Sequence, residues 1–409
     1  MYIKEFRIRN FMIHQDTSVK LSPLTVFVGP NGGGKSAFFD AMLNFSMLSR
    51  GSIQQAFGPY PYSFRATLYR GTASPVSRIW YHVSMSRNET DDEYLDYEID
   101  YAQTDDLPSF MIFNERLAKQ PGNVTLFDRS SPESFPLTRD LQLENDRSVF
   151  SALRQNKMTG QKVEVDDLVF YCAQQISRFN KFRLDPYFLA QPSRLPEVAD
   201  DSAVTSPPRI GYRGEDLATT LYHLAETRSQ TLDTIRDRVK EIDPEFSDFD
   251  FNIVGTDRVA FSVKYSDRRQ KVPAARLSSG NLIHLGLIVL VSTPNRPPVL
   301  MIEEPENGLT PQAIKAFYKA IRGLAHSNNP EQRSQVLMSS HSPFVICEAW
   351  NGEDRDFIHR MQVTDGKAQI RKFSDIVAEF KIPLAKDSTG QRMHLSLANA
   401  EEIMSGYYL

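Results

Sequence analysis

The stretch TVFVGPNGGGKSAFFDAM, residues 25–42, constrains the fold of this chain more than any other segment. It places a glycine-rich turn between an apolar run and a helical segment, and it matches the pattern G-x-x-x-x-G-K-[ST]. Such glycines let backbone N–H groups point at a phosphate, the following helix directs its positive end at the same anion, and the serine hydroxyl offers an oxygen to Mg²⁺. An ordinary glycine-rich turn is the alternative, but the flanking strand and helix favour a phosphate-binding loop. The predicted loop residues are Gly29, Pro30, Asn31, Gly32, Gly33, Gly34, Lys35 and Ser36.

Composition limits the remaining choices. The 409 residues are 41% hydrophobic and 24% charged, which is enough for a large core. The net charge of −4 argues against a nucleic-acid coat, although a local basic patch such as KYSDRRQKVPAAR is not excluded. The longest apolar run, residues 282–293, is shorter than the roughly 20 residues of a membrane span, and the start lacks a secretory signal. We therefore expect a cytoplasmic protein with no membrane contact.

Three short apolar segments predict the strands of a buried parallel sheet: residues 24–28, 298–302 and 334–340. Each leads into polar or turn-forming residues and then a helical pattern, which is typical of a doubly wound α/β core. Because the first segment lies near the N-terminus and the others lie beyond residue 298, a long segment is inserted between them.

The inserted segment has several parts. Period-two alternation in FRATLYRG, RIWYHVSMS and YLDYEIDYAQ predicts an antiparallel meander, and the apolar spacing of GEDLATTLYHLAETRSQTLDTIRDRVKEI predicts two helices that end before Pro244. Two short strands, DFDFNIV and VAFSVKY, follow. We expect a single unit over residues 1–409, with these parts: an α/β core of 1–50 and 298–375, a β meander over 60–104, an irregular insert over 105–208, and a helical lobe over 210–297.

Acidic residues and a histidine follow the later core strands. Glu303 and Glu304 stand where VLMIEEPENGL leaves its apolar strand, and His341 follows the strand that ends in MSSHSP. In a parallel sheet, ligands bind outside the carboxyl ends of the strands, beside the phosphate loop. A solvated turn and a structural histidine are the simpler readings. The position beside the loop instead favours a metal near Glu303, a water activated by Glu304, and a phosphate contact by His341.

The segment RLSSGN, residues 276–281, precedes an apolar helix that we expect from Leu282. Ser278 is a plausible N-cap of this helix. A helix start with serine and glycine can also bind a phosphate presented by another molecule. Both roles are compatible.

The four motifs together resemble those of ABC-type ATPases: Walker A GPNGGGKS, signature LSSGN, Walker B VLMIEEPENGL and switch SSHSP. With IKEFRIRNF near the start, the chain resembles the RecF, SMC and OLD (overcoming lysogenization defect) branch, and within it the compact AAA-family or RecF-like ATPases without a fused nuclease domain. The resemblance implies a P-loop NTPase fold: an ABC-type head with an antiparallel β subdomain and an inserted helical lobe.

The resemblance also implies ATP and Mg²⁺ as cofactors and a head-to-tail homodimer that sandwiches two ATP molecules. Ser278 and Gly280 of one subunit would touch the γ-phosphate held by Lys35 and Ser36 of the other. The family roles transfer to this sequence as follows: Glu304 as general base, His341 as γ-phosphate sensor, and Ser36 and Glu303 as Mg²⁺ partners.

This sequence departs from the family pattern at several positions. Glu303 stands where Asp is usual, Ser279 replaces a signature glycine, and Thr310 stands where relatives often have His. The Q-loop glutamine stays open among Gln103, Gln174 and Gln175.

Spacing narrows the functional hypotheses. The 241 positions from Ser36 to Leu277 are too many for a transporter ATPase and too few for a long SMC coiled coil, and the 68 residues after His341 leave no room for an OLD nuclease domain. We expect an ATPase whose dimerisation senses or clamps nucleic acid, with DNA as a candidate partner, and controls a separate effector such as a nuclease or toxin in DNA repair or anti-phage defence. The alternative is a nucleotide-gated scaffold that holds such a partner without contacting DNA. A metabolic kinase would leave LSSGN and SSHSP unexplained.

Overall fold

The three apolar segments predicted for the core form adjacent parallel strands: β3 (Leu24–Val28), β14 (Gln335–Ser340) and β13 (Val299–Glu303). Val26 lies opposite Met338, and Leu337 lies opposite Met301. Every residue of the three strands is buried. Their carboxyl ends therefore meet at one edge of the sheet, as the sequence predicts.

Three further strands complete this mixed sheet, in the order β16-β15-β3-β14-β13-β8. The strands β15 (Ile358–Thr364) and β8 (Asn180–Phe182) run parallel to their inner neighbours, whereas β16 (Lys367–Lys372) is antiparallel. The structure is a computed structural model that describes residues 1–57, 64–69, 78–103, 110–135, 141, 143–159, 165–195, 208–266, 271–294, 296–330, 332–352, 354–386 and 393–405.

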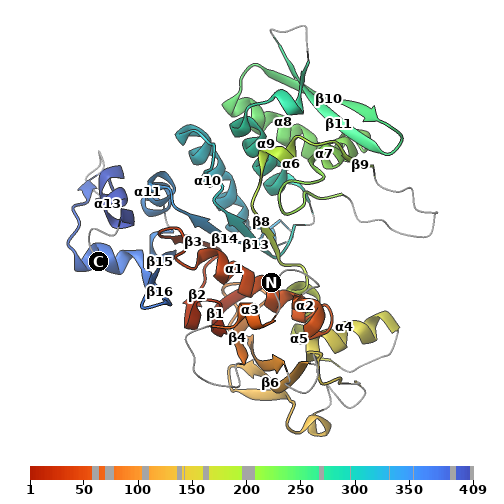
Figure 1. Cartoon of the computed structure of the whole chain (residues 1–409), viewed down its shortest axis with the longest axis vertical. Helices are drawn as coiled ribbons and strands as arrows, with labels where there is room; N and C mark the ends of the chain where they lie inside the picture. Colours follow the sequence, from red (N-terminus) through yellow and green to blue (C-terminus); the bar gives the residue numbers. More distant parts are fainter. Residues whose placement is uncertain are drawn as a thin grey trace.

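Helix α1 (Lys35–Leu48) lies between the mixed sheet and a second, antiparallel sheet. Its buried Phe38, Phe39 and Phe45 share one hydrophobic cluster with Phe27 of β3 and Phe6 of the antiparallel sheet. The opposite face of the mixed sheet packs on α10 (Pro311–Ala325) and α11 (Pro343–Asn351), and α9 (Ser279–Ser292) packs on α10. In Figure 1 the mixed sheet crosses the middle of the molecule, with the antiparallel sheet below and the helical lobe above.

The antiparallel sheet has six strands in the order β2-β1-β4-β5-β6-β7. Their bounds are β1 (Tyr2–Phe11), β2 (His14–Lys20), β4 (Ile79–Ser86), β5 (Tyr94–Gln103), β6 (Phe110–Gln120) and β7 (Val124–Asp128). The predicted pairing of β4 with β5 is confirmed. The strands β1 and β2, which we assigned to the α/β core with residues 1–50, instead pair with this sheet, because strand pairing is decided by long-range hydrogen bonds rather than by sequence position.

Two expectations about the middle of the chain are wrong. FRATLYRG was expected to open the meander, but its residues Phe64–Thr67 form the short helix α3, and the segment from residue 70 lies outside the described residues. The segment 105–208 was expected to be irregular, yet it contains β6, β7, β8 and several helices.

The sequence of β6 lacks a regular alternation of apolar and polar residues, for a physical reason. A bulge beside β5 places both Asn114 and Ile112 opposite consecutive residues of that strand, so the period-two pattern slips at Phe113. In addition, Glu115 is fully buried in β6, where an ion pair with Arg129 (2.6 Å) compensates its charge. A bulge and a buried carboxylate together hide the strand from a pattern based on polarity.

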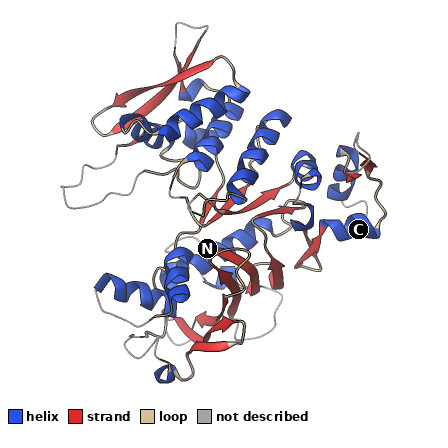
Figure 2. Cartoon of the chain, turned by 180° about the vertical axis from the view of Figure 1, so that it is seen from behind, coloured by secondary structure: helices blue, strands red, loops and turns tan. Residues whose placement is uncertain are grey.

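The helical lobe matches the prediction more closely. The two expected helices are α7 (Leu217–Glu226) and α8 (Gln230–Ile242), and the two expected strands are β10 (Phe246–Val254) and β11 (Arg258–Tyr265). Helix α9 begins three residues earlier than expected, at Ser279. Figure 2 shows these helices gathered against the projecting hairpin, at the opposite end of the molecule from the antiparallel strands.

The remaining elements are short. They are α2 (Ile53–Phe57), η1 (Pro132–Ser134), α4 (Val149–Thr159), α5 (Asp167–Ile176), α6 (Pro186–Leu189), β9 (Ser193–Arg194), β12 (Val272–Pro273), η3 (Ala274–Arg276), η4 (Arg355–Phe357), α12 (Phe373–Glu379), β17 (Ala385–Lys386), β18 (Met393–His394) and α13 (Leu397–Ser405). Among the described residues, every helix is too short or too polar to cross a bilayer.

Candidate active site

The predicted phosphate loop joins β3 to α1 and packs against the backbone of β15. Gly29 has φ +140°, and a Cβ added there would lie 2.0 Å from the carbonyl oxygen of Met361. Only glycine fits this position without a shift of the backbone. Gly33 and Gly34 are also buried, whereas Pro30, Asn31 and Gly32 are exposed. Ser36 is exposed in the first turn of α1.

Lys35 is buried at the start of α1, with 5% of its surface exposed. Its Nζ donates to the carbonyl oxygens of Gly29 (2.7 Å) and Pro30 (2.9 Å). Burial lowers the pKa of Lys35, and the lowering is opposed by three carboxylates, those of Glu304, Glu306 and Glu303. Lys35 of the loop therefore interacts electrostatically with the acidic segment at the end of β13.

Glu303 ends β13 and is almost fully buried on the α1 side of the mixed sheet. The Tyr212 hydroxyl donates to its Oε2 (3.3 Å), and the Lys181 Nζ lies 3.7 Å from the same oxygen. Lys181 comes from the edge strand β8 and also pairs with Asp40 of α1. Burial lowers the pKa of Lys181, but the charges of Asp40 and Glu303 outweigh burial and raise it overall. The Oε1 atom of Glu303 is buried and has no hydrogen-bond partner.

Glu304 is held in a strained backbone conformation with φ +46°. A non-glycine residue in the left-handed region costs energy that the surroundings must supply, and such residues cluster at functional sites. Its N–H donates to the Ser339 carbonyl (2.9 Å), and its Oε2 accepts from Asn307 (3.1 Å) and from the Arg183 guanidinium (3.1 Å). The carboxylate is partly open to solvent, with 17% of the side chain exposed.

Glu306 connects the acidic segment to the predicted switch histidine. Its Oε1 accepts from the Ser340 hydroxyl (2.7 Å) and from the backbone N–H of His341 (2.9 Å). The Nδ1 of His341 lies 3.5 Å from the same oxygen and 3.9 Å from Glu304 Oε1. The Oε2 of Glu306 is buried without a partner. Glu306 thus fixes the loop after β14 next to Glu304.

The oxygen donors at this edge fit Mg²⁺. This cation takes oxygen ligands and is commonly held by one or two protein groups together with substrate phosphates. The unpartnered, buried Glu303 Oε1 and the exposed Ser36 hydroxyl are donors of this kind. Within the described ranges, no three His, Cys, Asp or Glu side chains converge as a metal site.

The signature residues lie apart from the phosphate loop of their own chain. Ser278 caps α9, its Oγ accepting from the Asn281 N–H (3.1 Å), which confirms its predicted N-cap role. A Cβ on Gly280 would lie 2.5 Å from the carbonyl oxygen of Gly308, so the signature turn packs against the loop that follows Glu304. Ser278 is exposed, and in the described part of the chain neither Ser278 nor Gly280 hydrogen-bonds to the phosphate loop.

The structure therefore brings together Lys35, Glu303, Glu304 and His341, and it adds residues that the sequence did not reveal: Lys181, Arg183, Tyr212 and Glu306. Glu306 could have been noticed as the third carboxylate of EEPE. Arg183 directly follows β8 and pairs with Glu304. The three glutamines considered for the Q-loop lie elsewhere, Gln103 on β5 and Gln174 and Gln175 on α5.

Known domain families match both halves of this site. A model described as "AAA ATPase domain" matches residues 1–98, which include the phosphate loop. A model described as "AAA domain, putative AbiEii toxin, Type IV TA system" matches residues 202–347, which include the signature, the carboxylates and His341.

Individual relatives agree with these models. The chain is similar to an OLD nuclease from Thermus scotoductus, 23% identical over 357 residues, which are 83% of this chain and 59% of the relative. It is 43% identical over 51 residues to the DNA double-strand break repair Rad50 ATPase of Sulfolobus acidocaldarius, a match covering 12% of this chain and 6% of the relative. The chain thus spans less than two thirds of the length of these curated relatives.

The fold is that of an SMC head. A crystal structure of an SMC head bound to the C-winged helix domain of ScpA superposes with a TM-score of 0.51 at 12% identity, covering 92% of this chain and 99% of the other. The fold and the matched domains define a P-loop ATPase head. Together with the similarity to an OLD nuclease, these matches support an ABC-type ATPase similar to those of the RecF, SMC and OLD branch.

Proposed function

We propose that this chain binds ATP with Mg²⁺ at the carboxyl edge of the mixed sheet and hydrolyses it there. The observation that carries the proposal is the grouping of buried Lys35 with three carboxylates, one of them on the strained backbone of Glu304. A structural ion-pair cluster would not require a partly exposed carboxylate beside a phosphate loop.

The roles follow from position. Lys35 and the loop N–H groups bind the phosphates, while Ser36 and Glu303 hold Mg²⁺, which neutralises phosphate charge when bound. Glu304 is the general base, since its carboxylate is partly open to water. His341, fixed through its backbone by Glu306, directs its ring toward the same side as Glu304.

ATP-dependent pairing of two copies is the next part of the proposal. The exposed Ser278 makes no hydrogen bond to the phosphate loop of its own chain within the described residues. A head-to-tail homodimer would let Ser278 and Gly280 of one copy bind the γ-phosphate held by the other. Helix α9, which begins at this turn, supplies N–H groups suited to an anion.

We further propose that pairing senses or clamps DNA and controls an effector such as a nuclease or toxin. Support comes from the relatives: an OLD nuclease, a Rad50 ATPase of DNA repair, a domain family described with a toxin, and an SMC head that binds ScpA.

A nucleotide-gated scaffold that holds a toxin or nuclease without contacting DNA is the second candidate. Two cations of the basic stretch, Lys264 and Lys271, both pair with Asp250, at 3.2 Å and 2.5 Å. Because Asp250 offsets part of this charge, the stretch offers less attraction to DNA phosphates than its sequence indicates. Arg268 and Arg269 of the same stretch lie outside the described residues.

ATP turnover measured with and without linear duplex DNA tests the proposal, with Glu304→Gln as the control for chemistry. DNA-stimulated turnover that is lost in Glu304→Gln supports a DNA-responsive ATPase. Turnover that ignores DNA but still requires Glu304 favours the scaffold. Turnover that survives Glu304→Gln would remove the proposed base.

A further inference from the structure

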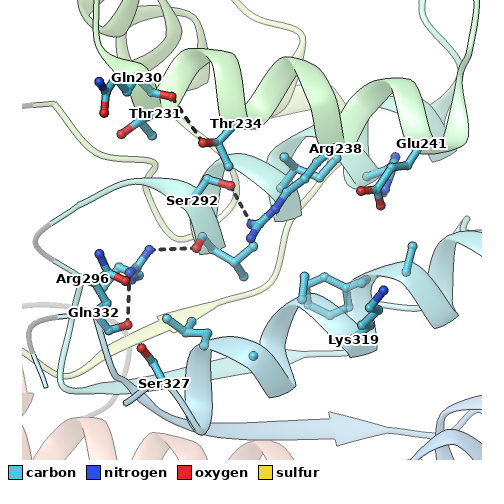
Figure 3. A pocket seen from close by; sticks show the side chains of 18 residues that line it. Gln230, Thr231, Thr234, Arg238, Glu241, Ser292, Arg296, Lys319, Ser327 and Gln332 are labelled. Atoms are coloured by element: carbon cyan, nitrogen blue, oxygen red, sulfur yellow. Dashed lines mark hydrogen bonds between the residues drawn. The ribbon is translucent and has the colours of Figure 1, made fainter. Parts of the chain in front are cut away.

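A cleft of about 620 Å³ separates α8 and α9 of the helical lobe from α10 of the core. Figure 3 shows Thr234 and Arg238 reaching into it from α8, Ser292 from α9, and Lys319 from α10. The volume lies within the roughly 300–1,000 Å³ range of small-molecule sites. None of the residues predicted for ATP binding or hydrolysis lines this cleft.

The lining has an excess of positive charge. Arg238, Arg296 and Lys319 come from three different segments, and Glu241 is the single acidic residue among the described residues of the lining. Arg238 donates to the Ser292 hydroxyl (2.8 Å), which is a neutral acceptor, and among the residues that the structure describes it forms no ion pair.

Arg296 adds a second charge close to Arg238. Burial lowers the pKa of Arg296, and the positive charge of Arg238 lowers it further. Its Nη atoms donate to carbonyl oxygens of Val291, Thr293 and Gln332, which is a structural role at the end of α9, while its Nε is buried without a partner. Two guanidinium groups that repel each other in a half-buried cleft are stabilised by an anion between them.

Part of the lining is apolar. Phe317 is 5% exposed, and Ile288 and Val291 of α9 also line the cleft. The cleft therefore combines a cationic, hydroxyl-bearing part with an apolar surface that includes one aromatic ring. This combination suits a ligand with an anionic group and a flat or apolar body.

We propose that the cleft between α8, α9 and α10 binds a small phosphorylated ligand, with its phosphate near Arg238 and Lys319 and its body against Phe317. The cleft is separate from the proposed ATP site, yet two of its three helices begin at segments to which we assign a role in ATP binding or hydrolysis. Helix α9 begins at the signature turn, and α10 begins shortly after Glu304 and Glu306. A ligand that bridges these helices would hold the helical lobe against the core.

Calorimetric titration of the full chain with AMP tests the proposal, in a Lys35→Ala background so that the phosphate loop does not contribute. We expect saturable binding that weakens by about tenfold or more in Arg238→Gln and in Lys319→Gln, because each removes a charge-assisted contact. The matched controls are Lys240→Gln on α8 and Lys315→Gln on α10, both exposed and outside the lining. They should leave AMP affinity unchanged. Arg296 is not substituted, because it stabilises the end of α9.

Titrations with ribose 5-phosphate and with inorganic phosphate show which part of the ligand the cleft binds. Tighter binding of AMP than of ribose 5-phosphate supports a nucleotide stacked on Phe317, and equal binding supports a phosphorylated sugar. Absence of binding by all three probes, or equal loss in the control variants, would overturn the proposal. So would Arg238-dependent binding of an acidic peptide where the phosphates do not bind. These outcomes are independent of whether the chain hydrolyses ATP.

Discussion

Replacement of Gly29 by alanine tests how the phosphate loop packs against β15. Alanine at φ +140° would strain the backbone, and its Cβ would meet the Met361 carbonyl oxygen at 2.0 Å. The strain costs about 1–2 kcal/mol, and overpacking against a backbone atom costs about 1–3 kcal/mol more. We expect Gly29→Ala to lower the free energy of unfolding by about 2–5 kcal/mol and to abolish ATP binding.

Gly32→Ala is the matched control within the same loop. Gly32 also has a positive φ, +75°, but nothing lies within 4 Å of an added Cβ. Only the strain of about 1–2 kcal/mol remains. Urea unfolding of both variants, with ATP affinity measured by fluorescence, gives the comparison. Equal destabilisation by the two substitutions would show that β15 does not pack against Gly29 as described.

Three further predictions concern the site and its support. Arg183→Gln should raise basal ATP turnover by up to about fivefold, because it releases the Glu304 carboxylate from an exposed ion pair of about 1 kcal/mol. A loss of turnover would instead place Arg183 on the phosphate. Glu306→Ala should lower the free energy of unfolding by about 2–5 kcal/mol in urea, since two donors after β14 lose their acceptor; unchanged stability would contradict this. Burial lowers the pKa of His14, which contacts the Gly34 carbonyl, to about 4. The unfolded chain therefore takes up the proton first, and stability present above about pH 6.5 should be lost toward pH 4, by about 3 kcal/mol. Unfolding at several pH values should show this loss, and a His14→Gln variant with the same slope would refute it.

Much of the site could be predicted because its motifs are local. The loop from Gly29 to Ser36 requires a strand before it and a helix after it, and both are visible as apolar patterns in the sequence. Glu303 and His341 follow continuous apolar runs, so their place at the carboxyl edge follows from the parallel sheet. The N-cap role of Ser278 is equally local.

Arg183 and Lys181 could not be predicted in the same way. Lys181 belongs to the three-residue strand β8, and Arg183 directly follows it. This strand is too short for any period to be measured, and it reaches the site only by pairing with β13. Tyr212 likewise contacts Glu303 from a loop far away in the chain. Their functional placement depends on which strand forms the edge of the sheet.

The sequence by itself determined the α/β core, the order of its motifs and the chemistry of the phosphate loop, because periodicity and spacing encode elements formed by neighbouring residues. The tertiary structure alone decided that β1 and β2 join the antiparallel sheet, that β6 tolerates a buried Glu115, and that Arg238 and Arg296 line one cleft beside α10. These features depend on hydrogen bonds and charge interactions between residues distant in the chain, and local sequence patterns do not identify such partners.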